Sequence, residues 1–225
     1  MSEKLPITKQ HLLIFTRWPE PGKTKTRLIA ALGSEGAARL QQRLTEHTVQ
    51  TAQHFCAQTT TPCQVNIFYT GATEQQMQQW LGSDFSYQAQ GTGDLGDRLQ
   101  QACQWAFAQG GEKVIIIGID CPGITSASLQ TAFTRLEQYL VVLGPALDGG
   151  YYLIGLTEFN PAYFQGIDWG TDKVYEQTLA KIQQNFSSDG VLLANVIYNL
   201  PTLADIDLPS DLKHLPETFA KTTGS

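Results

Sequence analysis

Three cations stand at alternate positions on a glycine turn near the N-terminus of the chain. The stretch FTRWPEPGKTKTR, residues 15–27, carries Lys23, Lys25 and Arg27 directly after Gly22. A glycine turn that opens onto a helix exposes free N–H groups, and these groups attract anions. Lysine adds positive charge, and arginine can hold a phosphate through two parallel hydrogen bonds. The stretch therefore predicts a phosphate-binding loop; the alternative is a solvated surface with unused cations.

An aspartate follows the most convincing buried-strand pattern of the sequence. The run VIIIGI, residues 114–119, is apolar on both faces, as in parallel strands covered by helices, and Asp120 comes next. Magnesium typically takes one or two protein carboxylates together with substrate phosphate oxygens. Asp120 is thus a candidate metal ligand that faces the same crevice as the phosphate-binding loop. The alternative is a turn or helix-capping residue before Pro122.

Two further aspartates are candidates for the catalytic step. Asp148 lies in LDGG, between two strand-like runs, and could position or deprotonate an acceptor hydroxyl. It could instead serve only as the first residue of an Asp-Gly hairpin turn. Asp168, in DWGTD, is the second candidate, and either Asp168 or Thr171 could simply cap the helix that follows. Trp169 beside it could stack on a ring or belong to the packed core.

Three more charged residues could reach the same crevice. Asp205 and Asp207, in ADIDLPSDL, could bind the same metal, and capping and turn formation are equally good interpretations of both. Arg98, in GDLGDRL, could reach a nucleotide base or phosphate. It could also be no more than an ion-pair partner for Asp94 or Asp97.

The elements that must position these residues alternate between strand and helix patterns. Strands are predicted at residues 11–15, 65–70, 85–89, 114–119, 139–146, 151–156 and 191–197. Helices are predicted at residues 24–32, 34–57 with Ser34 as N-cap, 74–81, 95–109, about 126–138 after a Thr125 or Ser126 cap, 172–185, and in one last short segment. This alternation predicts an α/β fold with a mostly parallel sheet, and the 139–156 hairpin pattern adds an antiparallel excursion. Ligands in such sheets bind at the carboxyl ends of strands, so the chemistry should lie after residues 15, 70, 119 and 146.

Composition favours one globular domain over residues 1–225, with loose tails at 1–9 and 217–225. The chain has 225 residues, 42% of them hydrophobic, and a net charge of −6, which argues against a general nucleic-acid binder. No apolar run approaches the ~18 residues of a membrane span, and the N-terminus has no signal-peptide core. We therefore expect a cytoplasmic protein without a membrane partner. The four cysteines show neither a CxxC pair nor zinc-site spacing.

Two nucleotide-binding motifs match only superficially. GKT at residues 22–24 resembles the end of a Walker A loop, but Arg17 stands where that loop needs a glycine, and Pro19 and Pro21 remove N–H donors. Residues 91–96 form a GxGxxG pattern, but they lie in the middle of the chain rather than in the first strand-to-helix turn. A tight entry into the helix at 95–109 explains these glycines as well.

Six blocks in order, from residue 15 to residue 212, resemble a known bacterial family. They are FTRWPEPGKTKTRL, GDLGDRL, IGIDCPG, LGPALDGGYYLIGL, DWGTDKVYEQTL and LPTLADIDLPSDL. The chain is identified as similar to the GT-A-fold glycosyltransferase family that accompanies radical-SAM proteins. That family was formerly a domain of unknown function and is often labelled arsenosugar-biosynthesis glycosyltransferase-like.

The resemblance implies a fold and roles for several residues. The fold is that of nucleotide-diphospho-sugar transferases, a three-layer αβα sandwich. By position, the nucleotide loop spans residues 16–27, with Thr16, Arg17, Gly22, Lys23, Lys25, Thr26 and Arg27 as binding residues. Asp120 matches the aspartate that holds Mg²⁺ or Mn²⁺ in relatives, and Asp207 matches the second aspartate of a late block that is a metal ligand in some cytidylyltransferases.

Three functions are compatible with these residues. The first is a glycosyltransferase that uses a nucleotide-diphospho-sugar donor and a divalent metal to glycosylate a small-molecule acceptor. The second is a nucleotidyltransferase, similar to the molybdenum-cofactor guanylyltransferases, that releases pyrophosphate. The third is a non-catalytic nucleotide-binding protein, because IGIDCP carries a single aspartate and the late block has Leu208 and Ser210 where threonine and glutamate are usual.

Overall fold

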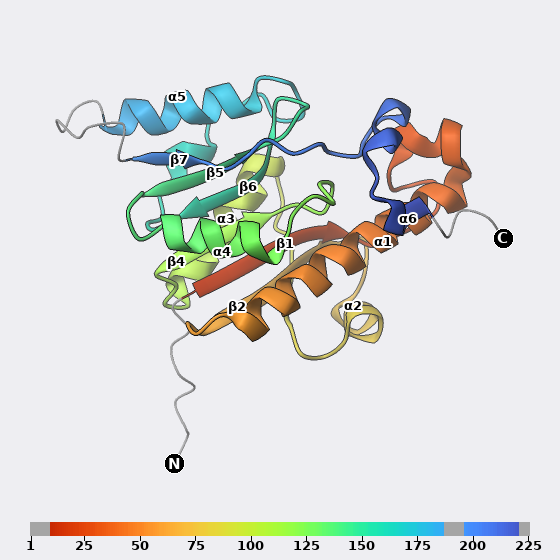
Figure 1. Ribbon diagram of the computed structural model, residues 1–225, viewed down its shortest axis with the longest axis horizontal. Coiled ribbons are helices and arrows are strands. Elements are labelled where there is room, and N and C mark those ends of the chain that lie inside the picture. The colour runs from red at the N-terminus through yellow and green to blue at the C-terminus, as the bar shows by residue number, and fades with distance from the viewer. Residues whose placement is uncertain (1–9, 187–195, 221–225) are drawn as a thin grey trace, which may run out of the picture.

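A single seven-stranded sheet organises the computed structural model, which describes residues 10–186 and 196–220. Its strand order is β3-β2-β1-β4-β6-β5-β7 (Figure 1). The strands are β1 (Gln10–Arg17), β2 (Cys63–Thr70), β3 (Ser86–Ala89), β4 (Lys113–Ile117), β5 (Val141–Pro145), β6 (Tyr151–Leu156) and β7 (Ile197–Asn199). Of the strand predicted at 191–197, residues 191–195 lie outside the described residues.

All neighbouring strands are parallel except those that pair with β6. Strands β1, β2, β3 and β4 form a parallel half, and β5 pairs with β7 in parallel. Strand β6 runs antiparallel to both β4 and β5, because it returns from β5 through the short turn at residues 146–150. The predicted mostly parallel sheet with an antiparallel excursion is confirmed.

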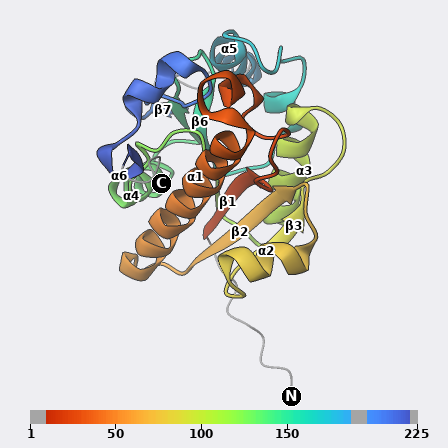
Figure 2. The ribbon, with the colours of Figure 1, turned by 90° about the vertical axis from the view of Figure 1, so that its right-hand side faces the viewer.

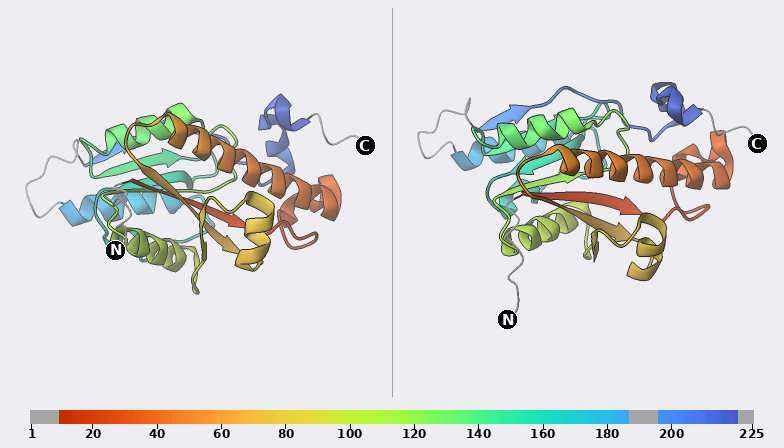
Figure 3. Two further views of the ribbon diagram at one scale, coloured as in Figure 1. Left: turned by 90° about the horizontal axis from the view of Figure 1, so that it is seen from below. Right: turned by 60° about the horizontal axis from the view of Figure 1, so that its bottom comes forward.

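Helices cover both faces of the sheet and make the three-layer sandwich. The helices are α1 (Ile29–Gln58), α2 (Glu74–Leu81), α3 (Leu95–Ala108), α4 (Ser126–Arg135), α5 (Val174–Phe186) and α6 (Glu217–Ala220), with 3₁₀ segments η1 (Thr26–Leu28), η2 (Pro161–Phe164) and η4 (Pro209–His214). Helices α1 and α4 lie on one face, and α3 lies on the other (Figure 3).

The alternation of side chains along β1 explains how one strand feeds two cores. Leu12 and Ile14 pack with α1 and α4, whereas Leu13 and Phe15 pack with α3 and α5. Successive side chains of a strand point to opposite faces, so a strand covered on both sides must be apolar throughout. This is why HLLIF and VIIIGI were recognisable as central strands.

Capping residues fix where the helices begin. Thr73, Asp94 and Thr125 accept hydrogen bonds from backbone N–H groups at the start of α2, α3 and α4, each within a capping box. Asp94 therefore caps α3, a role that was not predicted from the sequence. The helical stretch that begins at Ile29 continues past Gly33, whose φ of 70° interrupts it near the predicted start at Ser34. Only glycine adopts this left-handed conformation without strain.

Of the predicted loose tails, residues 217–220 are helical, whereas residues 1–9 and 221–225 lie outside the described part of the chain. Residues 217–220 form α6, the last labelled helix of the chain (Figure 2). The side chain of Phe219 is buried in the core cluster to which α1 also contributes. Arg43 donates hydrogen bonds to the carbonyls of Thr218 and Phe219, and its guanidinium lies over the Phe219 ring. In the part of the chain that is described, no helix has the length and apolar character needed to cross a membrane.

The packing of β5 against β6 yields a stability prediction at Gly144. A Cβ added there would lie 2.5 Å from Cζ of the Tyr152 ring, which is buried and held by a hydrogen bond from its hydroxyl to the Pro201 carbonyl. Gly144→Ala should therefore lower the free energy of unfolding by about 2 kcal/mol through overpacking. Urea unfolding measures this, with Gly118→Ala as the control, since a Cβ at Gly118 meets nothing within 4 Å. Equal stability of the two variants would contradict the described packing.

Candidate active site

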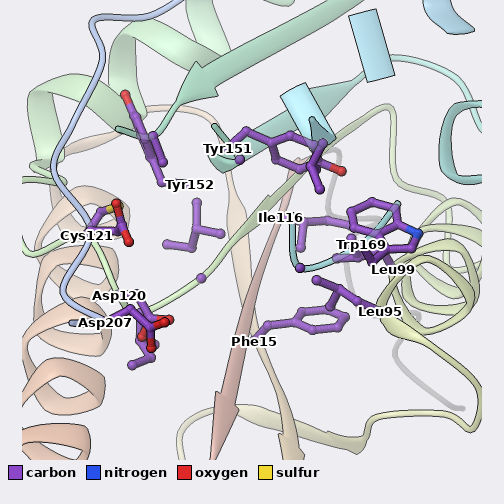
Figure 4. A pocket seen from close by; sticks show the side chains of 18 of the residues that line it. Phe15, Leu95, Leu99, Ile116, Asp120, Cys121, Tyr151, Tyr152, Trp169 and Asp207 are labelled. Atoms are coloured by element: carbon purple, nitrogen blue, oxygen red, sulfur yellow. The ribbon is translucent and has the colours of Figure 1, made fainter. Parts of the chain in front are cut away.

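The carboxyl ends of β1, β2 and β4 open into two adjoining cavities. One, the central cavity, has a volume of about 470 Å³ and lies over β1, β4 and β6 (Figure 4). The other, the loop cavity, has a volume of about 820 Å³ and lies between residues 17–27 and residues 204–214. Their shared lining residues are Arg17, Gln41, Asp120, Asp148, Gly170, Thr171, Asp205 and Asp207. The two cavities therefore form one divided cleft at the predicted edge of the sheet.

Lys25 and Asp120 meet inside this cleft. The Lys25 Nζ lies 2.8 Å from Asp120 Oδ1, and it also donates a hydrogen bond to the Ile206 carbonyl. The Lys25 side chain is only 4% exposed, whereas that of Asp120 is 51% exposed. Asp120 thus keeps a solvent-accessible face while its charge is matched by a buried ammonium group.

The backbone of Lys25 is unusual among the described residues. Its φ of 47° is the only positive value at a non-glycine position in residues 10–186 and 196–220. A lysine in this left-handed region costs about 1–2 kcal/mol, so other contacts must hold it there. The Leu28 N–H donates to the Lys25 carbonyl, and the buried Thr24 hydroxyl donates to the Glu20 carbonyl. The loop is folded so that the Lys25 side chain turns inward.

The other cations of the loop reach the cleft with exposed side chains. Arg27 makes an ion pair of 2.8 Å with Asp207, although its side chain is 64% exposed. Arg17 donates to the Lys23 carbonyl and lines both cavities. Lys23 pairs with Glu20 and is 70% exposed. These three side chains are free to turn toward an anionic ligand, because surface ion pairs are weak.

Residues 203–207 carry two further aspartates to the cleft. The Leu203 N–H donates to the Pro145 carbonyl, and the Ile206 N–H donates to the Asp120 carbonyl, so the segment is fixed beside β5 and the end of β4. Asp205 and Asp207 therefore line both cavities. Figure 4 shows Asp120 and Asp207 at the same end of the central cavity.

Negative charge accumulates at this end of the cleft. Burial, and then the charge of Asp148, raise the pKa of Asp205 above its usual value, with smaller contributions from Asp211 and Asp120. Burial, and then the charges of Asp120, Asp205 and Asp148, raise the pKa of Cys121, so its thiol stays protonated at neutral pH. A thiol in that state is a poor nucleophile. A bound cation would reduce the repulsion among these carboxylates.

The two candidate catalytic aspartates lie in different surroundings. Asp148 lines both cavities, and one of its carboxylate oxygens accepts a hydrogen bond from the Gly150 N–H, which closes the turn between β5 and β6. Asp168 lines neither cavity. Its carboxylate accepts a hydrogen bond from the side-chain amide of Gln177 on α5, and its own N–H donates to that amide's oxygen. The structure thus brings Asp148, but not Asp168, to the cleft.

Of the remaining candidate residues, some line a cavity and others do not. Thr16 and Arg98 line the central cavity, but the Thr16 hydroxyl bonds to the Thr45 hydroxyl, and the Arg98 Nε donates to the Gly93 carbonyl. Thr26 lines the loop cavity, whereas Gly22, with a φ of 78°, shapes the turn without lining either cavity. Arg98 makes no ion pair with Asp94, whose carboxylate is used as a cap.

Several lining residues were not predicted from the sequence. They include Phe15, Gln41, Thr70, Gln90, Leu95, Leu99 and Tyr151. Thr70 and Gln90 lie at the carboxyl ends of β2 and β3, so the rule that places ligands at these ends could have found them. Gln41 and Leu99 lie within helices and carry no comparable signal.

Comparison with known proteins places the chain in a family and a fold. A protein from Desulfovibrio desulfuricans G20, provisionally assigned as a nucleotide-diphospho-sugar transferase, is 32% identical in sequence. The similarity covers 96% of this chain and 89% of that one, with a TM-score of 0.82. No protein among those with curated functions matches the sequence.

More distant structures share the fold alone. A Methanothermobacter nucleotidyl transferase is 15% identical over 95% of this chain and 99% of its own, with a TM-score of 0.62. Glucosyl-3-phosphoglycerate synthase from Mycobacterium tuberculosis, solved with Mn²⁺, UDP and glucosyl-3-phosphoglycerate, is 11% identical over 91% and 75%, with a TM-score of 0.50. The predicted fold of transferases that act on nucleotides and nucleotide sugars is confirmed. Residues 33–171 match the family described as "Uncharacterized protein conserved in bacteria (DUF2064)", and the chain belongs to this family.

Proposed function

We propose that the protein is a glycosyltransferase that takes a nucleotide-diphospho-sugar donor and, with a divalent metal, glycosylates a small-molecule acceptor. The observation that carries this proposal is the 2.8 Å contact between Lys25 and Asp120. It brings the cationic loop and the carboxylate after β4 together in one cleft, which is large enough for a donor molecule. The similarity to the Desulfovibrio protein supports the same class of donor.

The diphosphate of the donor would lie against the cationic loop. Arg17 and Arg27 have exposed guanidinium groups that can exchange a backbone carbonyl or Asp207 for phosphate oxygens. Lys25 supplies a fixed charge at the inner wall of the loop cavity. When the glycosidic bond breaks, negative charge grows on the departing nucleoside diphosphate, and preorganised cations stabilise that charge in the transition state.

The carboxylates suit a divalent metal whose coordination shell is completed by oxygens of the donor. Asp120 and Asp207 are the residues that would hold the metal, with Asp205 nearby. The neighbouring carboxylates that raise the pKa of Asp205 repel one another, and a bound cation would reduce this repulsion. Among the described residues no three metal-binding side chains form a ready site, so phosphate oxygens would be needed to complete the shell. Bound there, Mg²⁺ or Mn²⁺ supplies Lewis-acid stabilisation of the diphosphate.

Asp148 is the residue that would orient or deprotonate the acceptor hydroxyl. The β5–β6 turn holds one of its oxygens against the Gly150 N–H, which fixes the direction of the carboxylate. Its position in both cavities puts it between the cationic loop and the apolar part of the central cavity. A base in this place could receive the acceptor proton as the new glycosidic bond forms.

A nucleotidyltransferase is the second candidate, favoured by the fold shared with the Methanothermobacter enzyme. It would take a nucleoside triphosphate and release pyrophosphate. To test this, wild-type protein is incubated with each triphosphate, a panel of phosphorylated acceptors and pyrophosphatase. If the donor is a nucleotide sugar, no pyrophosphate forms and no phosphate should be detected. Phosphate release that depends on an acceptor would replace the glycosyl assignment with this one.

Removal of the Asp120 charge tests the reaction itself. Asp120→Asn should reduce donor turnover by about 10²-fold or more, because both the metal and Lys25 lose their carboxylate. Nucleotide-sugar consumption is followed by chromatography, and Asp84→Asn, an exposed aspartate outside both cavities, is the control. Full turnover in a folded Asp120→Asn protein would contradict the proposal. Binding of nucleotides without turnover of any donor would favour the non-catalytic alternative.

Two lysines of the same loop provide a matched comparison. Lys25→Met removes the buried ammonium group that faces Asp120, whereas Lys23→Met removes a cation that is 70% exposed. We expect kcat/KM for the donor to fall about 10²-fold in Lys25→Met and less than about threefold in Lys23→Met, since exposed charges are screened by solvent. Circular dichroism confirms the fold of both variants. Equal losses in the two variants would show that position within the loop has no importance.

A further inference from the structure

We propose that the apolar end of the central cavity is the acceptor subsite and that it takes an alcohol with a flat, apolar body, with Trp169 as the wall that determines specificity. The inference rests on the proposed transferase function, because that function supplies the need for an acceptor. It adds the chemical class of the acceptor, which the family and the fold leave open.

Apolar side chains from four elements or loops converge at this end of the cavity. Phe15 of β1, Leu99 of α3 and Ile116 of β4 are buried and form its floor. Leu95, at the start of α3, is 43% exposed at its rim, and Trp169 comes from the loop before α5. Figure 4 shows these five side chains grouped together, apart from Asp120, Cys121 and Asp207. A flat apolar ring would find aromatic and aliphatic contacts here.

The Trp169 ring is held in place from two sides. A Cβ on Gly96 would lie 2.2 Å from Trp169 Nε1, so the ring lies directly on the backbone of α3. Its loop is anchored by the paired hydrogen bonds between Asp168 and Gln177 and by the bond from the Thr171 hydroxyl to the Asp168 carbonyl. Asp168 therefore acts as a positioning residue for Trp169. A rigid aromatic wall is suited to select the shape of a ligand.

Two polar side chains at this end, Gln90 and Arg98, are partly engaged within the protein. The side-chain amide of Gln90 donates to the carbonyls of Thr16 and Phe68, which uses both of its donors. The Nε of Arg98 donates to the Gly93 carbonyl. A polyol placed against Phe15 and Trp169 would give up hydrogen bonds to water without full replacement, whereas an apolar body would gain from burial. This asymmetry favours an acceptor with one reactive hydroxyl on an apolar frame.

The exposed side chains at the rim of the cleft include apolar ones. Among the described residues, the large apolar side chains that are strongly exposed are Leu95, Leu147 and Leu208. Leu95 lines the central cavity, and Leu147 and Leu208 line the adjoining loop cavity. Leu147 is the most exposed of them, at 65%, and it precedes Asp148. Exposed leucines gathered at one cleft, rather than scattered, indicate a surface that meets an apolar ligand. An acceptor entering over Leu147 would bring its hydroxyl to the Asp148 side of the cavity.

Calorimetry on the intact protein tests this inference with two probes, 2-naphthol and glycerol. The variants are Trp169→Ala, Leu95→Ser and, as a matched control, Trp80→Ala, whose indole lies outside both cavities and bonds to Glu46. We expect 2-naphthol to bind wild type and Trp80→Ala equally, and to bind Trp169→Ala and Leu95→Ser about tenfold more weakly. Glycerol should show no binding. Leu95→Ser changes an exposed residue, so the test stands even if Trp169→Ala does not fold.

Three outcomes would overturn the inference. They are equal binding of 2-naphthol to all variants, binding of glycerol as tight as that of 2-naphthol, and a loss of UDP or GDP affinity in Trp169→Ala as large as the loss for 2-naphthol. The last result would show that Trp169 contacts the nucleobase of the donor rather than the acceptor. If the naphthol pattern holds but no nucleotide binds, the apolar-alcohol site stands and the proposed donor chemistry fails.

Discussion

The ion pair between Lys25 and Asp120 is the contact on which the rest of the cleft depends. Burying an ammonium group is costly unless an opposite charge and hydrogen-bond acceptors meet it, and Asp120 and the Ile206 carbonyl do so. The same lysine has a left-handed backbone, which directs its side chain inward from the turn. One side chain thus joins three parts of the chain: the cationic loop, the end of β4 and the segment before η4.

Sheet topology explains why charges distant in sequence share one cleft. Strands β1, β2 and β4 run parallel, so the loop after β1 and the aspartate after β4 emerge at the same edge. Strand β6 is antiparallel to both β4 and β5, so β5 runs in the same direction as β4. The turn after β5 therefore lies at the same edge and brings Asp148 to it. The chain from β7 continues beside β5 to the end of β4 and so delivers Asp205 and Asp207. The result is a cleft with cations on one wall, carboxylates at its centre and apolar side chains at its far end.

The sequence predicted the fold well and the pairing of site residues poorly, for physical reasons. Strand and helix patterns are local, so HLLIF, VIIIGI and the helix at 74–81 could be recognised directly. Partners such as Arg27 and Asp207 are 180 residues apart, and nothing local connects them. Asp168 was given a catalytic role because an aspartate in a loop looks the same whether it faces a cavity or Gln177. Trp169 likewise could be assigned to a wall of the cavity only once Gly96 and α3 were in place.

Thermal unfolding in the presence of nucleoside diphosphates tests the central claim most directly, namely that this cleft binds a diphosphate between the cationic loop and Asp120. ADP, GDP, UDP and CDP are compared with and without Mn²⁺, in wild type and in Arg27→Gln. At least one should raise the Tm of wild type, and more so with Mn²⁺, since a ligand at a hundred times its Kd adds about 2.7 kcal/mol of stability. The shift should shrink in Arg27→Gln. No shift in wild type with any of the four nucleotides, at concentrations up to the millimolar range and with either metal condition, would contradict the account.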